Sequence, residues 1–182
     1  LNMGKSENIV RLHAFERQFV YNALAAAAAA YSLGVDFRTI VRGIEKFTPP
    51  KHRLNVFISK KYGLIFDDTY NSNPKAAEES LDTFGLVSGN RNKIAVIGDM
   101  LELGKLEENS HRELGKKAGS MGFSLIVGVG DAARFIVEEA SKKSKKGKCY
   151  LAGDYNEALE IVLPHLSKSS ALFVKGSRSV HL

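Results

Sequence analysis

The sequence has little cysteine and no long apolar run, and both shortages limit the classes of protein it can belong to. Cys149 is the only cysteine among 182 residues, so no disulfide can form within the chain. Such a composition fits a reducing compartment, and we expect a cytoplasmic protein. The most apolar stretch, from Ala23 to Tyr31, is far shorter than the roughly 20 residues that span a bilayer, so we expect no membrane insertion.

Three catalytic patterns are missing as well. The sequence has no Cys/His cluster for a metal ion, no nucleophile elbow, and no Gly-x-x-x-x-Gly-Lys-Ser/Thr phosphate loop. Gly128 and Gly130 follow an apolar run, but Ala133 stands where the dinucleotide-binding pattern usually has a third glycine, which makes that signal weak. The residues alone therefore predict no metal site and no complete site for nucleotide phosphates.

Positive charge is in excess, with a formal net charge of +6. Part of it is concentrated in residues 142–148, which include five lysines. A nucleic-acid surface normally combines lysine with arginine and interleaved aromatic rings, and this run has neither. We interpret the run as a solvated loop between a helix and a strand, and we expect no nucleic-acid partner.

The first part of the chain is mainly helical in pattern. Residues 8–15 alternate weakly between polar and apolar side chains and predict a strand. A helix is predicted from Val20 to Leu33, which contains seven alanines between positions 23 and 30, and Gly34 marks its end. Apolar residues at helical spacing predict a second helix from Asp36 to Phe47.

Thr48-Pro49-Pro50 ends the second helix, and we divide the chain there into domains at residues 1–48 and 49–182. Short apolar runs then alternate with amphipathic segments. Strands are predicted at 54–58, 64–66, 93–98, 124–129, 148–151 and 171–175, and helices at 75–84, 111–121, 131–141 and 155–166. This alternation predicts an α/β fold with a doubly wound, Rossmann-like, mostly parallel sheet. Ligands of such sheets bind at the carboxyl ends of the strands.

Two candidate motifs lie at the start of the second domain. Residues 67–74, Asp-Asp-Thr-Tyr-Asn-Ser-Asn-Pro, follow a predicted strand, and adjacent carboxylates can accept hydrogen bonds from ribose hydroxyls or hold a metal-bound water. The same residue types also favour a turn and a helix N-cap. In residues 51–54, Arg53 suits a phosphate or carboxylate, although a basic surface cluster is equally compatible with the pattern.

Two further candidates follow later strands. Residues 98–104, Gly-Asp-Met-Leu-Glu-Leu-Gly, precede His111, and they suit either a ligand-binding loop or a loop with capping carboxylates. His111 alone more often bonds locally at a helix start than acts on a substrate. Residues 175–178, Lys-Gly-Ser-Arg, offer two cations, a hydroxyl and open backbone amides for an anion, or form a basic surface loop.

Taken in order, these segments resemble the Mur ligase family over nearly the whole chain. The motifs that carry the resemblance are Tyr21 to Ala27, His52 to Leu54, Asp67 to Pro74, Gly98 to Gly104 with His111, and Lys175 to Ser179. Each motif alone is modest, whereas five in the family's order are specific. The amino-acid sequences of these motifs are similar to those of the members that add D-alanyl-D-alanine, rather than to those of the other members or of folylpolyglutamate synthetase.

The resemblance implies an ATP-dependent amide-bond ligase of peptidoglycan synthesis, with Mg²⁺ as metal cofactor. In that reaction ATP phosphorylates the terminal carboxylate of UDP-N-acetylmuramoyl-tripeptide, and the amine of D-alanyl-D-alanine then displaces phosphate from the acyl phosphate. The resemblance implies that the residues nearest the nucleotide are Asn22, Arg53, Asp67, Asp68, Tyr70 and Asn71. It implies that the residues near the other substrates are Asn73, His111, Lys175, Ser177 and Arg178.

The resemblance also implies that part of the apparatus lies outside this sequence. In the family, the phosphate loop, the metal-binding Glu and His, the modified lysine and the UDP-binding domain precede the region matched here. The chain starts at Leu1 rather than methionine. We therefore expect the end of a central domain followed by a C-terminal domain, which works with the N-terminal and central domains of the same protein, as a monomer, and cannot ligate alone.

Two alternatives remain open from the sequence. The missing phosphate loop favours a non-catalytic module that binds a nucleotide or a phosphate. Another Mur-like ligase, such as folylpolyglutamate synthetase, would share the fold and the order of motifs. The sequence of residues 70–74, Tyr-Asn-Ser-Asn-Pro, favours the D-alanyl-D-alanine-adding members over this second alternative.

Overall fold

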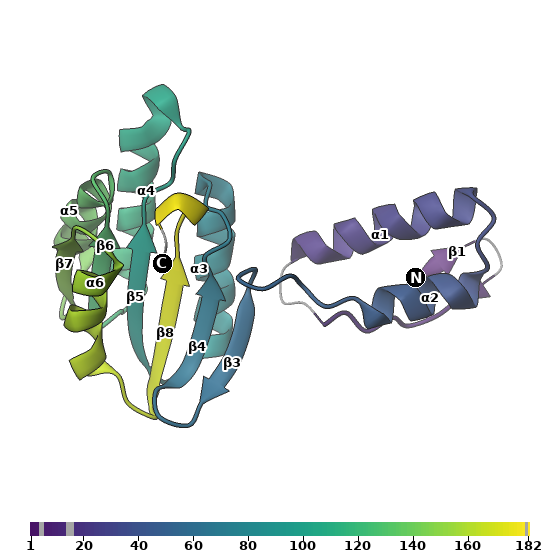
Figure 1. Ribbon diagram of the computed structural model, residues 1–182, viewed down its shortest axis with the longest axis horizontal. Helices are drawn as coiled ribbons and strands as arrows, with labels where there is room; N and C mark the ends of the chain where they lie inside the picture. The colour runs from purple at the N-terminus through teal and green to yellow at the C-terminus, as the bar shows by residue number, and fades with distance from the viewer. Residues whose placement is uncertain (4–5, 14–16, 181) are drawn as a thin grey trace. The chain divides into compact units, whose positions relative to one another are not determined.

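The computed structural model describes residues 1–3, 6–13, 17–180 and 182, and the chain forms two compact units (Figure 1). Unit 1 comprises Leu1–Pro50 and unit 2 comprises Lys51–Leu182. Within the described residues, no helix is both long and apolar enough to cross a membrane.

Unit 1 consists of two helices and a short hairpin. The first helix, α1 (Arg17–Ser32), contains the alanine run, and Gly34 follows it with a φ of +79°, a conformation that favours glycine. The second helix, α2 (Phe37–Lys46), begins at Asp36, whose carboxylate accepts a hydrogen bond from the amide of Thr39 (3.0 Å). Both predicted helices are therefore confirmed. Among the residues of this unit whose burial is described, the buried apolar ones are Ala27, Ile40 and Val41.

The strand predicted at residues 8–15 is wrong over residues 8–13, and residues 14 and 15 lie outside the described part of the chain. Instead, β1 (Asn2–Met3) and β2 (Ser6–Glu7) form a short antiparallel pair. The amide of Arg11 donates to the carboxylate of Glu45 (3.3 Å) rather than to a neighbouring strand. Weak alternation predicts an extended segment, but a strand also needs a second backbone with which to pair.

Unit 2 is built around a six-stranded sheet in the order β3-β4-β8-β5-β6-β7. The strands are β3 (Asn55–Ser59), β4 (Gly63–Asp68), β5 (Asn92–Gly98), β6 (Leu125–Val129), β7 (Lys148–Ala152) and β8 (Ser170–Lys175). β3 and β4 form an antiparallel hairpin, and the other neighbouring strands pair in parallel. The predicted strands and the mostly parallel sheet are confirmed.

Helices cover both faces of this sheet (Figure 1). They are α3 (Pro74–Ser88), α4 (Glu107–Ser120), α5 (Ala133–Lys143) and α6 (Tyr155–Val162). On one face, Ala158 and Val162 of α6 join the buried cluster that contains Ile94 of β5. On β8, Phe173 pairs with Ala95 rather than with Ile94, so its ring points to the opposite face. The doubly wound arrangement is therefore confirmed.

The opposite face is filled by aromatic rings. Phe84 of α3 lies with its ring centroid 5.7 Å from that of Phe66 on β4 and 5.3 Å from that of Phe173 on β8. It also stacks on Phe123, with 5.5 Å between ring centroids. Aromatic contacts of this kind anchor α3 against β4 and β8.

The path of the chain places its last strand in the middle of the sheet. β4, β5, β6 and β7 are joined in sequence by α3, α4 and α5, and α6 then returns the chain so that β8 inserts between β4 and β5. The carboxyl ends of β4, β8 and β5 consequently lie next to one another. We call this part of unit 2 the carboxyl edge.

Helices α4 and α5 approach each other very closely. A Cβ atom on Gly115 would lie 2.5 Å from the carbonyl oxygen of Ile136, and a Cβ atom on Gly119 would lie 2.7 Å from that of Ala140. Real Cβ atoms do not occupy such positions, so glycine is what allows the two backbones to meet. The contact brings α4 against α5 along two turns.

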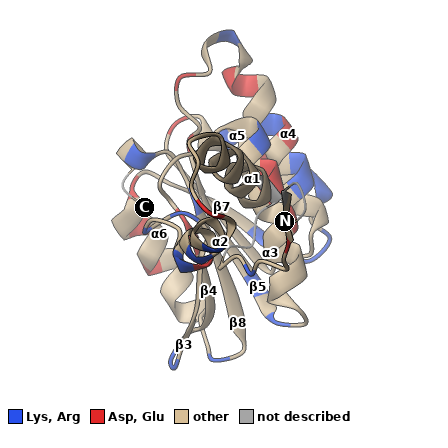
Figure 2. Ribbon diagram, turned by 90° about the vertical axis from the view of Figure 1, so that its right-hand side faces the viewer, with Lys and Arg blue, Asp and Glu red and all other residues tan. Residues whose placement is uncertain are grey.

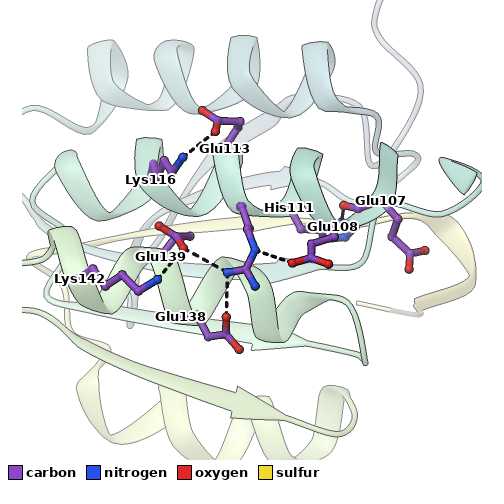
Figure 3. A network of polar contacts seen from close by, with 9 residues as sticks. Glu107, Glu108, His111, Glu113, Lys116, Glu138, Glu139 and Lys142 are labelled. Carbon is purple, nitrogen blue, oxygen red and sulfur yellow. Dashed lines mark hydrogen bonds and ion pairs between the residues drawn. The ribbon is translucent and has the colours of Figure 1, made fainter. Parts of the chain in front are cut away.

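Charged side chains also join these helices. Figure 2 shows acidic and basic segments close together along α4. Arg112 donates to Glu108 (2.8 Å) on its own helix and to Glu138 (2.8 Å) and Glu139 (3.1 Å) on α5, and Figure 3 shows these three carboxylates turned toward one point. The hydrogen bonds to Glu108 and Glu138 raise the pKa of the Arg112 guanidinium. Lys142, the first residue of the lysine run, pairs with Glu139 (2.7 Å). Lys142 and Lys143 end α5, Lys148 begins β7, and Lys145 and Lys146 lie in the connection between them.

Candidate functional site

The carboxyl edge brings together the four candidate segments, which are residues 51–54, 67–74, 98–104 and 175–178. Asp68 at the end of β4 pairs in register with Lys175 at the end of β8. Lys175 also pairs with Ile97 of β5, and Gly98 of β5 pairs with Val129 of β6. The candidate segments that follow these strands therefore lie side by side, because parallel strands end at the same edge of a sheet.

Asp68 and Lys175 form a buried ion pair. The Nζ atom of Lys175 lies 2.7 Å from Oδ2 of Asp68, and the lysine side chain is only 1% exposed. Nζ also donates to the carbonyl oxygens of Asn71 (2.7 Å) and Asp68 (3.3 Å). Asp68 accepts a hydrogen bond from the hydroxyl of Ser80 (2.8 Å) through Oδ2, and another from the amide of Leu54 (3.2 Å) through Oδ1. Each charge is thus compensated by the other and by further hydrogen bonds, as burial requires.

Asp67 and its neighbours are more accessible. Its Oδ2 atom lies 2.8 Å from Nδ1 of His52, and its Oδ1 atom accepts hydrogen bonds from the amide (3.2 Å) and hydroxyl (2.8 Å) of Thr69. The amide of Tyr70 donates to the carbonyl oxygen of His52 (2.9 Å). The Arg53 guanidinium lies 4.7 Å from the centroid of the Tyr70 ring, and both side chains are exposed. The edge therefore presents a cation stacked on an aromatic ring.

Unusual backbone conformations flank Arg53. His52 has a φ of +65° and Leu54 a φ of +48°, although neither is a glycine. Such conformations cost about 1–3 kcal/mol each and persist only where the surroundings hold them. Here the holding contacts are known, because Tyr70 donates to the carbonyl of His52 and Asp68 accepts from the amide of Leu54. The position of Arg53 is therefore fixed by the motif at residues 67–74.

The loop from Tyr70 to Asn73 leads directly into α3. Asn73 is the N-cap of that helix, and its side-chain oxygen accepts a hydrogen bond from the amide of Ala76 (2.9 Å). The side-chain oxygen of Asn71 accepts a hydrogen bond from the amide of Ser72 (2.8 Å). The hydroxyl of Ser72 is buried and has no hydrogen-bond partner within the described residues. The capping role that the sequence left open is thus present at Asn73.

Ser177 connects three of the segments. Its hydroxyl oxygen accepts a hydrogen bond from the amide of Leu101 (3.1 Å) and donates to the carbonyl oxygen of Ser72 (3.5 Å). Its amide donates to the carbonyl oxygen of Asp99 (3.2 Å). The carboxylate of Asp99 accepts a hydrogen bond from the amide of Ala133 (2.7 Å), the first residue of α5.

The remaining candidates lie in different surroundings. His111 is fully buried: its Nε2 atom accepts a hydrogen bond from the amide of Met100 (2.9 Å), and its Nδ1 atom donates to the carbonyl oxygen of Glu107 (2.7 Å). It therefore supports the loop after β5 from inside the unit. Arg178 is exposed at the start of a 3-10 helix. Asn22 lies on α1 in unit 1 and is exposed, whereas the carboxyl edge belongs to unit 2.

Ser80 is a site residue that sequence reasoning missed. It is fully buried on the face of α3 that also carries Ala77, Leu81 and Phe84. A serine on the buried face of a helix usually needs a polar partner, and that pattern was the available signal. Its partner is Asp68, which lies twelve positions earlier in the sequence.

The carboxylates of the edge make hydrogen bonds within the protein. Asp67, Asp68 and Asp99 each accept hydrogen bonds from groups of the protein. Over the residues that the structure describes, no group of three or more His, Cys, Asp or Glu side chains could hold a metal ion. The exposed charges at the edge include Arg53 and Arg178, which suit an anionic ligand instead.

Comparison with known proteins gives a consistent result. Residues 52–178 match the family model described as Mur ligase, glutamate ligase domain. The chain is 28% identical over 176 residues to the UDP-N-acetylmuramoyl-tripeptide–D-alanyl-D-alanine ligase of Bacillus subtilis. The aligned region covers 97% of this chain and 38% of that protein. A crystal structure of MurF from Acinetobacter baumannii superposes with a TM-score of 0.76 and 36% identity, over 94% of this chain and 37% of that one.

A second solved structure, MurF ligase from Thermotoga maritima in complex with ADP, gives a TM-score of 0.72 and 27% identity. It covers 94% of this chain and 38% of that chain. The chain thus spans less than two fifths of the length of these relatives.

Proposed function

The chain belongs to the Mur ligase family, and we propose that it is the C-terminal part of an ATP-dependent ligase of peptidoglycan synthesis. The ligase would join D-alanyl-D-alanine to UDP-N-acetylmuramoyl-tripeptide. Two findings support this proposal. The Bacillus subtilis relative, which aligns with 97% of the chain, carries that activity in its name, and the Thermotoga maritima relative was solved with ADP.

We assign residues 1–48 to the end of the central domain and residues 49–182 to the C-terminal domain. The family match at residues 52–178 supports the second assignment. We assign the elements that hold the nucleotide phosphates and Mg²⁺ to the rest of the parent ligase, because the sequence contains no phosphate loop and the described residues contain no group of three or more metal-ligating side chains. The isolated chain would therefore not ligate.

The proposed reaction has two steps. A carboxylate oxygen of the tripeptide attacks the γ-phosphorus of ATP, ADP leaves, and an acyl phosphate forms. The amine nitrogen of D-alanyl-D-alanine then attacks the acyl carbon, and inorganic phosphate leaves as the amine gives up a proton. Both steps bring anions together, so cations positioned around them lower the barrier.

Arg53 and Tyr70 carry the proposal most directly. They are exposed, they stack on each other at 4.7 Å, and the strained backbone beside Arg53 is held by Asp68 and by the amide of Tyr70. A guanidinium held in this way can bind a nucleotide phosphate through its fork of donors. We also assign Asn22, Asp67 and Asn71 to the nucleotide, and Asn73 and Arg178 to the other substrates. Asp68, His111, Lys175 and Ser177 are buried, and we assign them to the support of these residues.

Replacing Arg53 by alanine in the parent ligase tests this function. Hydrogen bonds to a charged group contribute about 1.5–3 kcal/mol, so the KM for ATP should rise roughly 10- to 150-fold. ADP release would be measured with UDP-N-acetylmuramoyl-tripeptide and D-alanyl-D-alanine present. Lys61→Ala is the matched control, because Lys61 also lies over a tyrosine ring (4.9 Å from Tyr62) but at the β3–β4 turn, the opposite end of β4.

The outcomes separate the alternatives. A wild-type parent that binds ADP but forms no product with any amine would instead be a nucleotide-binding module. A parent that forms product only with a folate and glutamate would belong to another branch of the family. An unchanged KM for ATP in Arg53→Ala would remove Arg53 from the nucleotide site.

A further inference from the structure

The buried amine of Lys175 has its three donors in use. The ammonium group carries three protons, and the structure provides three acceptors for it. They are Oδ2 of Asp68 at 2.7 Å, the carbonyl oxygen of Asn71 at 2.7 Å and the carbonyl oxygen of Asp68 at 3.3 Å. With 1% of the side chain exposed, no donor remains for a substrate.

We propose that Lys175 is a positioning residue that fixes the loop from Tyr70 to Asn73 and the segment around Arg53, and that it does not bind substrate itself. The proposal rests on the ligase function proposed above. It replaces the substrate contact that the sequence suggested for Lys175 with a structural link between the middle of the sheet and the nucleotide-binding residues.

The link to the loop runs through Asn71. Its carbonyl oxygen receives a charge-assisted hydrogen bond from Nζ, and such bonds are about twice as strong as neutral ones. Asn71 follows Tyr70 directly, so fixing this carbonyl restricts the backbone beside the Tyr70 ring. Lys175 is the last residue of β8, a central strand, and its backbone is paired on both sides. A rigid strand thus determines where the loop lies.

The link to Arg53 runs through Asp68. Lys175 holds Oδ2 of Asp68, which leaves Oδ1 directed at the amide of Leu54 (3.2 Å). Leu54 is one of the two residues with positive φ that flank Arg53. Loss of the lysine would leave the carboxylate buried without its counter-charge, and the carboxylate would then turn toward water.

Ser177 extends the same support to the loop after β5. Two residues beyond Lys175, its hydroxyl accepts from the amide of Leu101 and donates to the carbonyl oxygen of Ser72. The β8 end therefore holds both neighbouring loops through side chains that are themselves buried. This arrangement coordinates the two loops rather than presenting Lys175 or Ser177 to a ligand.

The test compares Lys175→Met, which leaves Asp68 unpaired, with Asp68→Asn/Lys175→Met, which removes both charges. The matched control is Asp82→Asn/Lys117→Met, because Lys117 and Asp82 also form a 2.7 Å ion pair between α3 and α4, but with 28% and 65% of their side chains exposed. All variants are made in the parent ligase, and Tm and the KM values for ATP and D-alanyl-D-alanine are measured. Amide hydrogen exchange at residues 70–73 is also measured in the 182-residue chain.

Positioning predicts a specific pattern. Lys175→Met should lower Tm, and the double variant should recover most of that loss because no buried charge remains unpaired. Both should nevertheless raise the KM for ATP by about tenfold or more, since misplaced binding groups lose affinity. Exchange at residues 70–73 should become about tenfold faster in the double variant and stay unchanged in the control.

Other results overturn the proposal. A selective rise in the KM for D-alanyl-D-alanine in the double variant would make Lys175 a substrate ligand. Unchanged exchange at residues 70–73 would show that the lysine does not hold the loop. If the wild-type parent proves inactive as a ligase, the proposed function fails, and the exchange measurement still decides whether Lys175 positions the loop.

Discussion

Gly115→Ala is expected to destabilise unit 2, although alanine is the better helix former. In a helix interior, alanine is favoured over glycine by about 1 kcal/mol. The added methyl group, however, would lie 2.5 Å from the carbonyl oxygen and 2.8 Å from the Cα of Ile136. Optimal carbon contacts are about 3.5–4.0 Å, so α4 and α5 would have to separate by roughly 1 Å.

Overpacking of this kind costs about 1–3 kcal/mol, and we take the upper end because the contacts are with backbone atoms, which cannot rotate away. After the gain in helix propensity is subtracted, the free energy of unfolding should fall by about 2 kcal/mol. Urea denaturation followed by circular dichroism measures this change, and amide exchange in β5 reports on unit 2 specifically.

Gly85→Ala provides a control of opposite sign. Gly85 lies in α3, and the nearest atom to its added Cβ would be the flexible end of Met121, at 3.3 Å. This variant should be as stable as the wild type or up to about 1 kcal/mol more stable. If Gly115→Ala also matched or exceeded the wild type, the close helix contact would not constrain the fold, and the reasoning would be refuted.

Two other predictions concern single side chains. Hydrogen bonds from Thr39 lower the pKa of Asp36. The charged carboxylate therefore stabilises α2 fully at pH values above the unfolded-state pKa of Asp36, and this stabilisation is lost as the pH falls through the folded-state pKa. Helical circular dichroism should therefore decline more on acidification in the wild type than in Asp36→Asn, and equal declines would contradict this. Ser72→Ala removes a buried hydroxyl that has no hydrogen-bond partner in the described part of the chain, so the urea midpoint should stay the same or rise. A fall of more than about 1 kcal/mol in the free energy of unfolding would show that the hydroxyl is hydrogen-bonded.

The sequence was sufficient to locate the candidate site but not to orient its side chains. Asp68, Gly98 and Lys175 each end an apolar run, and strand ends of a parallel sheet share one edge, so their proximity could be predicted. The burial of Lys175 could not be predicted. It depends on carbonyl oxygens at Asp68 and Asn71, more than a hundred positions earlier, and on a loop whose shape no local pattern specifies.

The same limit applies elsewhere in the chain. His111 stands near a helix start, as the sequence predicted, but its hydrogen bond with the amide of Met100 forms only once α4 packs against the loop after β5. Residues 8–13 fail as a strand for a related reason, since periodicity describes one segment whereas pairing requires two. Periodicity thus predicted the strands of unit 2 well, because each of them has a neighbouring strand in the six-stranded sheet with which to pair.

The central place of β8 has a consequence for how the protein is made. On the ribosome, β3 to β7 emerge first, and until residues 170–175 leave the exit tunnel the β3–β4 hairpin and the β5–β6–β7 group have no strand to join them. More than a hundred residues are synthesised between Asp68 and its counter-ion, Lys175, so the ion pair cannot form until β8 has emerged. Completion of the sheet and completion of the candidate site are therefore a single late event, and a nascent chain released before β8 would have neither.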